Sequence, residues 1–173
     1  MNYPPFDPFP ELVSGRLLLR ELHPSDASDL VEIFTYNGKP ATDEADVTRM
    51  LGLIHDNYLQ GEGINWGITD KQTGEVIGTC GYYRGFPNAT GEIGFILRSK
   101  HYRKGYMAEA LRLIIAFGQQ HLQLDRIIAV TKPANTAAIR LLGGLGFEST
   151  GPWEDEKSSG VYTGYVYNGT AAS

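Results

Sequence analysis

The sequence predicts a mixed α/β (α+β) domain with a mostly antiparallel central sheet flanked by helices. Its 173 residues suffice for one hydrophobic core and are short for two. Hydrophobic residues make up 42% of the chain and charged residues 20%, which is typical of a globular protein. Segments with hydrophobic residues at every second position alternate with segments where they recur every three or four, so strands and helices are mixed along the chain. We expect one domain over residues 1–173.

The amino-terminal segments predict an arm, a strand and a helix. Four prolines among residues 1–10 predict an extended arm that docks on the domain. A strand is expected over residues 12–22, with three consecutive leucines at its centre. Hydrophobic residues then recur at helical spacing from Ala27 to Phe34, behind Pro24, which suits a first helical turn.

A second helix and three strands follow. Thr42 can cap a helix whose hydrophobic face runs from Val47 to Tyr58, and Gly61 ends it. The period then changes to two, and the turns between the next segments predict an antiparallel meander. Its three strands are expected at residues 64–68, 76–83 and 92–98.

The carboxyl-terminal part predicts two helices and two strands. Helical spacing runs from Lys104 to about His121, and a β-branched strand is expected at residues 126–131. Asn135 opens a short helix, and a final strand covers residues 161–167. Each of the two glycines at 143 and 144 costs a helix about 1 kcal/mol relative to alanine. We therefore expect this short helix to end early.

The composition argues against several classes of function. A net charge of −5 without any run of Lys or Arg argues against a nucleic-acid partner. Cys80 is the only cysteine, and the four histidines lack the spacing of metal ligands, so we expect neither a disulfide nor a metal site. The chain shows no export signal and no run of about 18 apolar residues. We expect a cytoplasmic protein without a membrane span.

The junction between the third strand of the meander and the next helix carries the main chemical signal. The strand runs into a basic turn with Arg98, Arg103 and Lys104, and Gly105 precedes the helix. The first N–H groups of a helix lack internal partners and lie at the positive end of its dipole, so they suit a phosphate. Gly105 allows close approach, and the cations add charge. The alternative is a plain connector whose basic side chains only solvate the turn.

This stretch resembles the acetyl-CoA signature of the GNAT superfamily, Gln/Arg-x-x-Gly-x-Gly/Ala, which stands here as residues 102–107. Residues 105–111 resemble the form found in the branch of ribosomal-protein N-terminal (alanine/serine) acetyltransferases. Three further segments resemble that branch in the expected order, so the likeness covers nearly the whole chain. They are residues 11–20, residues 24–27, and residues 133–140 followed by Leu145-Gly146-Phe147.

The resemblance implies a GNAT-like fold in which two adjacent parallel strands splay to admit coenzyme A. It also implies acetyl-CoA as co-substrate and no metal. Backbone amides of the strand before the basic turn would meet the thioester and pantetheine arm, the turn and helix start would meet the pyrophosphate, and Asn135 would contact the pantetheine while capping its helix. The implied cofactor-binding residues are Phe95, Ile96, Leu97, Arg98, Arg103, Lys104, Gly105, Tyr106, Met107, Ala108 and Asn135.

Transfer to an amine needs a group that takes a proton, because amines in water are mostly charged. Glu92, at the head of the strand that leads into the basic turn, is the candidate by position and by resemblance. Its alternative is an exposed carboxylate at a strand end. Leu142 stands where many GNAT enzymes have a tyrosine, and Ala138 where the branch often has serine, so no general acid is assigned.

The sequence is therefore compatible with two functions. The first is an acetyl-CoA-dependent N-acetyltransferase that acts by direct attack of a primary amine, whether a protein N-terminus, a polyamine or a small amine. The second is a noncatalytic acyl-CoA-binding module that keeps the groove and lacks productive acid and base groups. The acceptor is left open, as is the choice between monomer and homodimer.

Overall fold

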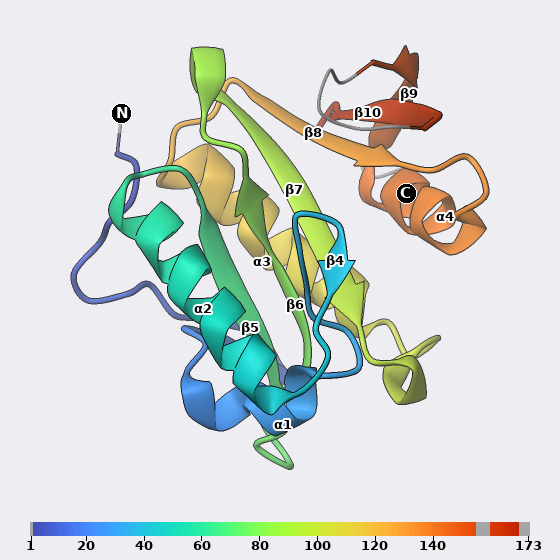
Figure 1. The fold of residues 1–173 in the computed structure, drawn as a ribbon. Helices are drawn as coiled ribbons and strands as arrows, with labels where there is room; N and C mark the ends of the chain where they lie inside the picture. The colour runs from blue at the N-terminus through green and yellow to red at the C-terminus, as the bar shows by residue number, and fades with distance from the viewer. Residues whose placement is uncertain (1, 155–159, 170–173) are drawn as a thin grey trace.

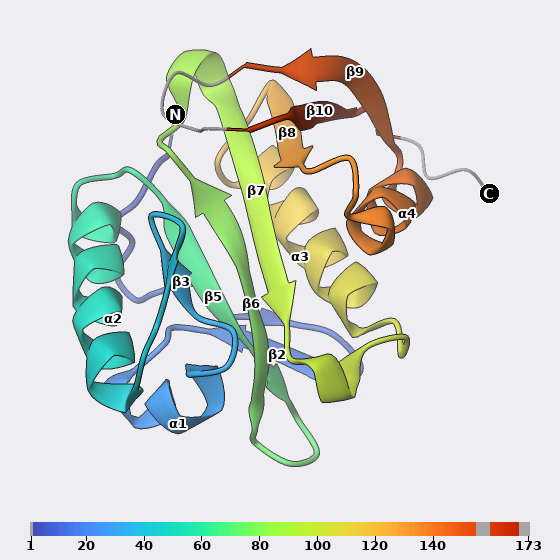
Figure 2. The ribbon, with the colours of Figure 1, turned by 45° about the vertical axis from the view of Figure 1, so that its right-hand side comes forward.

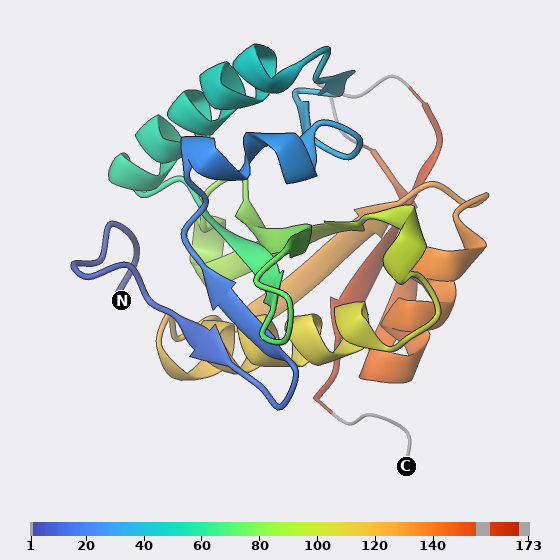
Figure 3. The same cartoon turned by 90° about the horizontal axis from the view of Figure 1, so that it is seen from below.

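The computed structural model describes residues 2–154 and 160–169, and within them eight strands form one sheet (Figure 1). The strand order is β1-β2-β5-β6-β7-β8-β10-β9. Seen end-on in Figure 3, the sheet lies between α1 and α2 on one side and α3 and α4 on the other. The predicted fold class is confirmed, because every described pair in this sheet is antiparallel except β7 with β8.

The element bounds are these. The large sheet contains β1 (Leu12–Val13), β2 (Leu17–Arg20), β5 (Ile64–Asp70), β6 (Val76–Tyr83), β7 (Thr90–Leu97), β8 (Arg126–Thr131), β9 (Phe147–Trp153) and β10 (Tyr162–Tyr167). The small hairpin contains β3 (Thr35–Tyr36) and β4 (Lys39–Pro40). The helices are α1 (Ala27–Leu30), α2 (Glu44–Leu59), α3 (Tyr106–Gln120) and α4 (Thr136–Leu145), with single 3₁₀ turns at Pro24–Asp26, Pro87–Ala89 and Ser99–His101.

The meander, α3, β8, α4 and β10 lie close to their predicted positions, whereas β9 was not predicted and the amino-terminal elements differ. The strand expected over residues 12–22 is a hairpin of β1 and β2. The helix expected from Ala27 to Phe34 is limited to a 3₁₀ turn and α1, although Phe34 is still buried. Helix α4 does not end early: Leu142 and Leu145 are buried, and their packing holds the exposed glycines between them in helical form.

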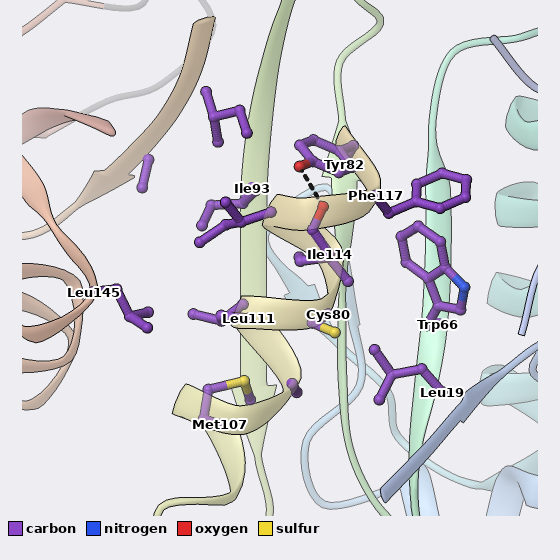
Figure 4. Packing of buried hydrophobic residues seen from close by; sticks show 14 of the residues in the cluster. Leu19, Trp66, Cys80, Tyr82, Ile93, Met107, Leu111, Ile114, Phe117 and Leu145 are labelled. Carbon is purple, nitrogen blue, oxygen red and sulfur yellow. Dashed lines mark hydrogen bonds between the residues drawn. The ribbon is translucent and has the colours of Figure 1, made fainter. Parts of the chain in front are cut away.

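The central core lies between the sheet and α3. Figure 4 shows Trp66 of β5 and Tyr82 of β6 packed against Ile114 and Phe117 of α3. The Tyr82 hydroxyl donates a 2.7 Å hydrogen bond to the carbonyl of Ile114, which satisfies a polar group that is otherwise buried. A second cluster joins α1, α2 and the start of β6 on the opposite face.

The parallel strands β7 and β8 pair over only part of their length. Their register runs from Thr90 opposite Arg126 to Ile93 opposite Ala129. β7 continues to Leu97 and β8 to Thr131 without further pairing to each other. The two strands therefore part on the side where β7 leads into α3, as Figure 2 shows.

Candidate active site

The amino terminus of α3 is open. Its N-cap is Gly105, and no side chain caps its first turn. By contrast, Asp43 caps α2 through the amide of Asp46, and Asn135 caps α4. The first backbone N–H groups of a 15-residue helix are thus available to an anion at the positive end of the helix dipole.

The turn before α3 has the backbone that close approach to an anion needs. Arg103 and Gly105 both have left-handed backbone angles, with φ of 60° and 78°. Glycine adopts this conformation freely, whereas for arginine it costs about 1 kcal/mol. Arg103 and Lys104 are exposed, so both cations can move toward a ligand placed at the helix start.

The hairpin of β1 and β2 holds the first turn of α3 in place. The Glu109 carboxylate accepts hydrogen bonds from the Ser14 hydroxyl at 2.6 Å and from the Arg16 side chain at 2.8 Å. Arg16 also donates to the Lys104 carbonyl at 2.9 Å and lies 4.2 Å from the centre of the Tyr106 ring. Burial disfavours the charged carboxylate, but these hydrogen bonds outweigh it and lower the pKa of Glu109.

Sequence reasoning did not assign a role to Glu109. An acidic residue in the first turn of a helix suits the helix dipole anyway. The sequence therefore contains no sign that Glu109 holds the β1–β2 hairpin, because its partners Ser14 and Arg16 lie more than 90 residues away along the chain.

The end of β7 pairs with β6 and has no partner on the side of β8, where it presents backbone groups to the gap. Arg98 donates its N–H to Ile77 of β6. Alternation along an antiparallel ladder then directs the N–H and C=O groups of Ile96 toward β6, and those of Phe95 and Leu97 toward the side of β8. Of the three residues expected to offer backbone contacts, two have the required direction.

The Arg98 side chain is engaged elsewhere. Its guanidinium donates to Glu75 at 2.6 Å and to Glu32 at 2.7 Å, and it lies 3.5 Å from a carboxylate oxygen of Asp29. Lys100 donates a further 2.6 Å hydrogen bond to Glu75, and this bond together with Arg98 holds the pKa of Glu75 below its ordinary value. Both the side chain and the amide of Arg98 thus tie the end of β7 to the region of α1 and to β6, and the side chain is not directed to the turn before α3.

The other expected contact residues divide into exposed and packed ones. Met107 is 7% exposed and belongs to the core, so it offers its amide rather than its side chain. The Asn135 side-chain oxygen accepts from the amide of Ala138 at 3.2 Å, which confirms its capping role and leaves its NH₂ group for a ligand. Ala138 and Leu142 are buried, and neither carries an ionisable group.

Glu92 lies on the sheet face opposite α3. In the register it stands between Tyr83 of β6 and Ile128 of β8. Its side chain is 19% exposed, and its carboxylate lies 3.9 Å from the Arg84 guanidinium. Glu92 is therefore a partly buried carboxylate at the last rungs before β7 and β8 part.

Among the described residues, no group of three or more His, Cys, Asp or Glu side chains is placed to hold a metal ion. No helix in the described part of the chain has the length and hydropathy needed to cross a membrane.

The chain belongs to the GNAT acetyltransferase family, since residues 16–148 match the family described as Acetyltransferase (GNAT) domain. It is 36% identical over 158 residues to the uncharacterized N-acetyltransferase p20 of Bacillus licheniformis, covering 86% of this chain and 89% of that protein. It is 30% identical over 158 residues to the ribosomal protein uS5-alanine N-acetyltransferase of Escherichia coli (strain K12), covering 83% and 81%.

The fold is also similar to a solved ribosomal L7/L12 alpha-N-protein acetyltransferase in complex with coenzyme A. The TM-score is 0.78 at 16% identity, and the match covers 91% of this chain and 97% of that one. The predicted resemblance and the enzyme class, an N-acetyltransferase, are confirmed.

Proposed function

We propose that this protein transfers the acetyl group of acetyl-CoA to a primary amine by direct attack. The observation that carries the proposal is the open amino terminus of α3, one turn after the end of β7 that has no partner strand on the side of β8. A ligand with phosphates at one end and an acyl thioester at the other matches this arrangement of anion site and free strand backbone. One structural neighbour is described as a coenzyme A complex, which supports the choice of ligand.

Three neighbouring parts of the chain would hold successive parts of acetyl-CoA. The amides of Tyr106, Met107 and Ala108 would hold the pyrophosphate, with Gly105 allowing the approach and Arg103 and Lys104 adding charge. The backbones of Phe95 and Leu97 would bond the pantetheine arm and polarise the thioester carbonyl. Asn135 would reach the pantetheine with its NH₂ group. Arg98 and Ile96 would act only by holding β7 in place.

The reaction needs few protein groups. The neutral amine attacks the thioester carbon, a tetrahedral oxyanion forms, and the C–S bond breaks to give an amide and the CoA thiolate. Glu92 would take the proton that the amine loses, directly or through water. No side chain is assigned to return a proton to the thiolate, since the positions of Ala138 and Leu142 are apolar and buried.

One assay tests the proposal. The protein is incubated with acetyl-CoA and a panel of N-terminal peptides, polyamines and small amines while free thiol is followed. The panel includes peptides because one relative is named a ribosomal protein uS5-alanine N-acetyltransferase. Thiol release that depends on an amine is expected; CoA binding without turnover across the panel would identify the noncatalytic module instead.

Glu92→Gln tests the role of the base. At pH 7 the value of kcat/KM should fall about 100-fold, the usual size of a general-base effect. The deficit should shrink near pH 9, because an α-amine with a pKa of about 8 then loses its proton to solvent. Glu44→Gln, which removes an exposed carboxylate from α2, is the control. Equal kcat/KM for Glu92→Gln and the wild type at pH 7 would exclude Glu92 as the base.

A further inference from the structure

If Glu92 takes the proton of the amine, the acceptor must reach the sheet face that carries Glu92. Ile93, Phe95 and Leu97 pack toward the core beneath α3, so the alternate residues of β7 lie on the opposite face. Helices α3 and α4 cover the first face, whereas α1 and α2 lie on the second face, where they contact β6 and β5 (Figure 3). On the second face, Glu92, Gly94 and Ile96 follow one another along β7 toward the gap.

An aromatic ring lies over this face on the β7 side of the gap. Tyr83 stands beside Glu92 in the register, and its ring covers Gly94: a Cβ added at Gly94 would come within 2.7 Å of ring atom Cε2. The Tyr83 hydroxyl donates a 2.7 Å hydrogen bond to the side-chain oxygen of Asn65, which is 9% exposed. Burial raises the pKa of Tyr83, so the hydroxyl remains a donor at neutral pH.

A second ring lies over the same face on the far side of the gap. Trp153 of β9 covers Gly164 of β10, where an added Cβ would lie 2.7 Å from ring atom Cε3. Gly164 pairs with Val130 of β8, and Val130 is the residue after the last rung that joins β8 to β7. Gly94 likewise follows the last rung on β7. The two ring-covered glycines therefore lie on one row, on either side of the point where the strands part.

We propose that Tyr83 and Trp153, the aromatic pair, form the walls of the acceptor entrance and determine which amines reach Glu92. This inference rests on the proposed function and adds which amines the enzyme accepts. Glycine under each ring lets the ring lie low against the sheet, and Asn65 fixes one ring by its hydroxyl. Aromatic faces also attract the charged ammonium before it loses its proton.

The chemical class selected is a primary amine on a slender chain. Glu92 is bounded in its row by Tyr83 and by Ile128, which is 7% exposed, so little space remains for groups branching near the nitrogen. An acceptor with hydrogen or methyl beside its amine should enter, whereas one with a branched or aromatic group there should meet the rings. A difference of one methylene in such a pocket changes kcat/KM by about 10- to 200-fold.

The test compares peptide acceptors that begin with alanine or phenylalanine. In Tyr83→Ala and Trp153→Ala, the ratio of kcat/KM for the alanine peptide to that for the phenylalanine peptide should fall about tenfold, with CoA affinity unchanged. Tyr83→Phe keeps the ring and loses the bond to Asn65, so a smaller fall in the same direction is expected, carried by KM for the acceptor.

Tyr82→Phe is the matched control, because it removes the hydroxyl of the neighbouring tyrosine on the opposite face. It should lower stability and leave the ratio unchanged. A ratio unchanged in Tyr83→Ala and Trp153→Ala, in enzymes that bind CoA and turn over alanine peptide, would overturn the aromatic pair alone. Wild-type protein that binds CoA but acetylates no amine would overturn the proposed function, and the aromatic pair with it.

Discussion

Single side chains fix the contact between α3 and the sheet. The Tyr82 ring sits between Gly91 of β7 and Gly118 of α3, where a Cβ at either glycine would meet the ring or its hydroxyl. The glycine in the last turn of α3 is thus explained by the hydroxyl that it accommodates. Its usual cost in a helix is offset by the buried hydrogen bond of Tyr82 to Ile114.

Gly118→Ala should destabilise the protein although alanine is the better helix former. The added methyl would displace the Tyr82 hydroxyl, and overpacking of this kind costs about 1–3 kcal/mol. Gly143→Ala is the control, because open space surrounds that exposed glycine of α4. It should stabilise by about 0.5–1 kcal/mol. Urea denaturation of both variants measures the free energy of unfolding. If this free energy changed in the same direction in both variants, the prediction would be wrong.

The pair of Arg20 and Asp26 makes stability depend on pH. Two hydrogen bonds at 2.8 and 2.9 Å join the guanidinium to the carboxylate, which also accepts from the amide of His23. Burial disfavours the charged carboxylate, but these bonds outweigh it and lower the pKa of Asp26 in the folded state. The lowered pKa contributes stability that is present above the unfolded-state value of about 3.9 and is lost as pH falls through the folded value.

Asp26→Asn should therefore lower the free energy of unfolding by about 2 kcal/mol at pH 7, as expected for charged hydrogen bonds. The difference from the wild type should narrow as the pH is lowered below about 4. Urea titrations at several pH values measure it. A difference that stays constant down to pH 3 would show that the charge of Asp26 is not its source.

Sequence patterns located the helices and strands whose burial pattern is regular. The passage from β7 through the basic turn into α3 was predictable because the hydrophobic period changes there and a basic segment intervenes. β9 was not, since its middle residues are exposed and Gly151 and Pro152 break any alternation in this edge strand. The engagement of Arg98 also escaped prediction, because its partner carboxylates lie on α1, just after it and just before β6.

Asn135 links the stability of α4 to the proposed cofactor contact, and two substitutions separate these roles. Asn135→Asp keeps an oxygen that caps the helix and removes the NH₂ donor. It should retain stability and bind CoA several-fold more weakly. Asn135→Ala should lose both, with about 1 kcal/mol from the missing cap. Thermal unfolding and calorimetric titration with CoA provide the two readouts; unchanged CoA affinity in Asn135→Asp would leave the residue a cap only.

The amino-terminal arm joins the two helical layers, α2 and α3, that the sheet separates. The backbone of Phe6 exchanges two 2.8 Å hydrogen bonds with the Tyr58 hydroxyl of α2, and its ring meets Phe117 of α3 edge-on. Further along, the Pro10 carbonyl accepts from the Trp66 indole at 2.8 Å. The prolines predicted a docked arm. The residues that the arm contacts could not be predicted, because they lie on α2, β5 and α3, which meet only in the folded chain.

Removing residues 2–10 should lower the free energy of unfolding by about 3 kcal/mol or more, since several aromatic side chains lose burial. Trp66, which is fully buried, should become accessible, so its fluorescence should shift to the red and respond to quenchers. Tyr3→Ala is the control, because it removes the stack on Phe86 at the end of the arm and leaves the hydrogen bonds of Phe6 and Pro10 in place, and it should cost about 1 kcal/mol. A truncated protein with the urea midpoint of the full chain would show that the arm's contacts contribute nothing to the stability of the layers they connect.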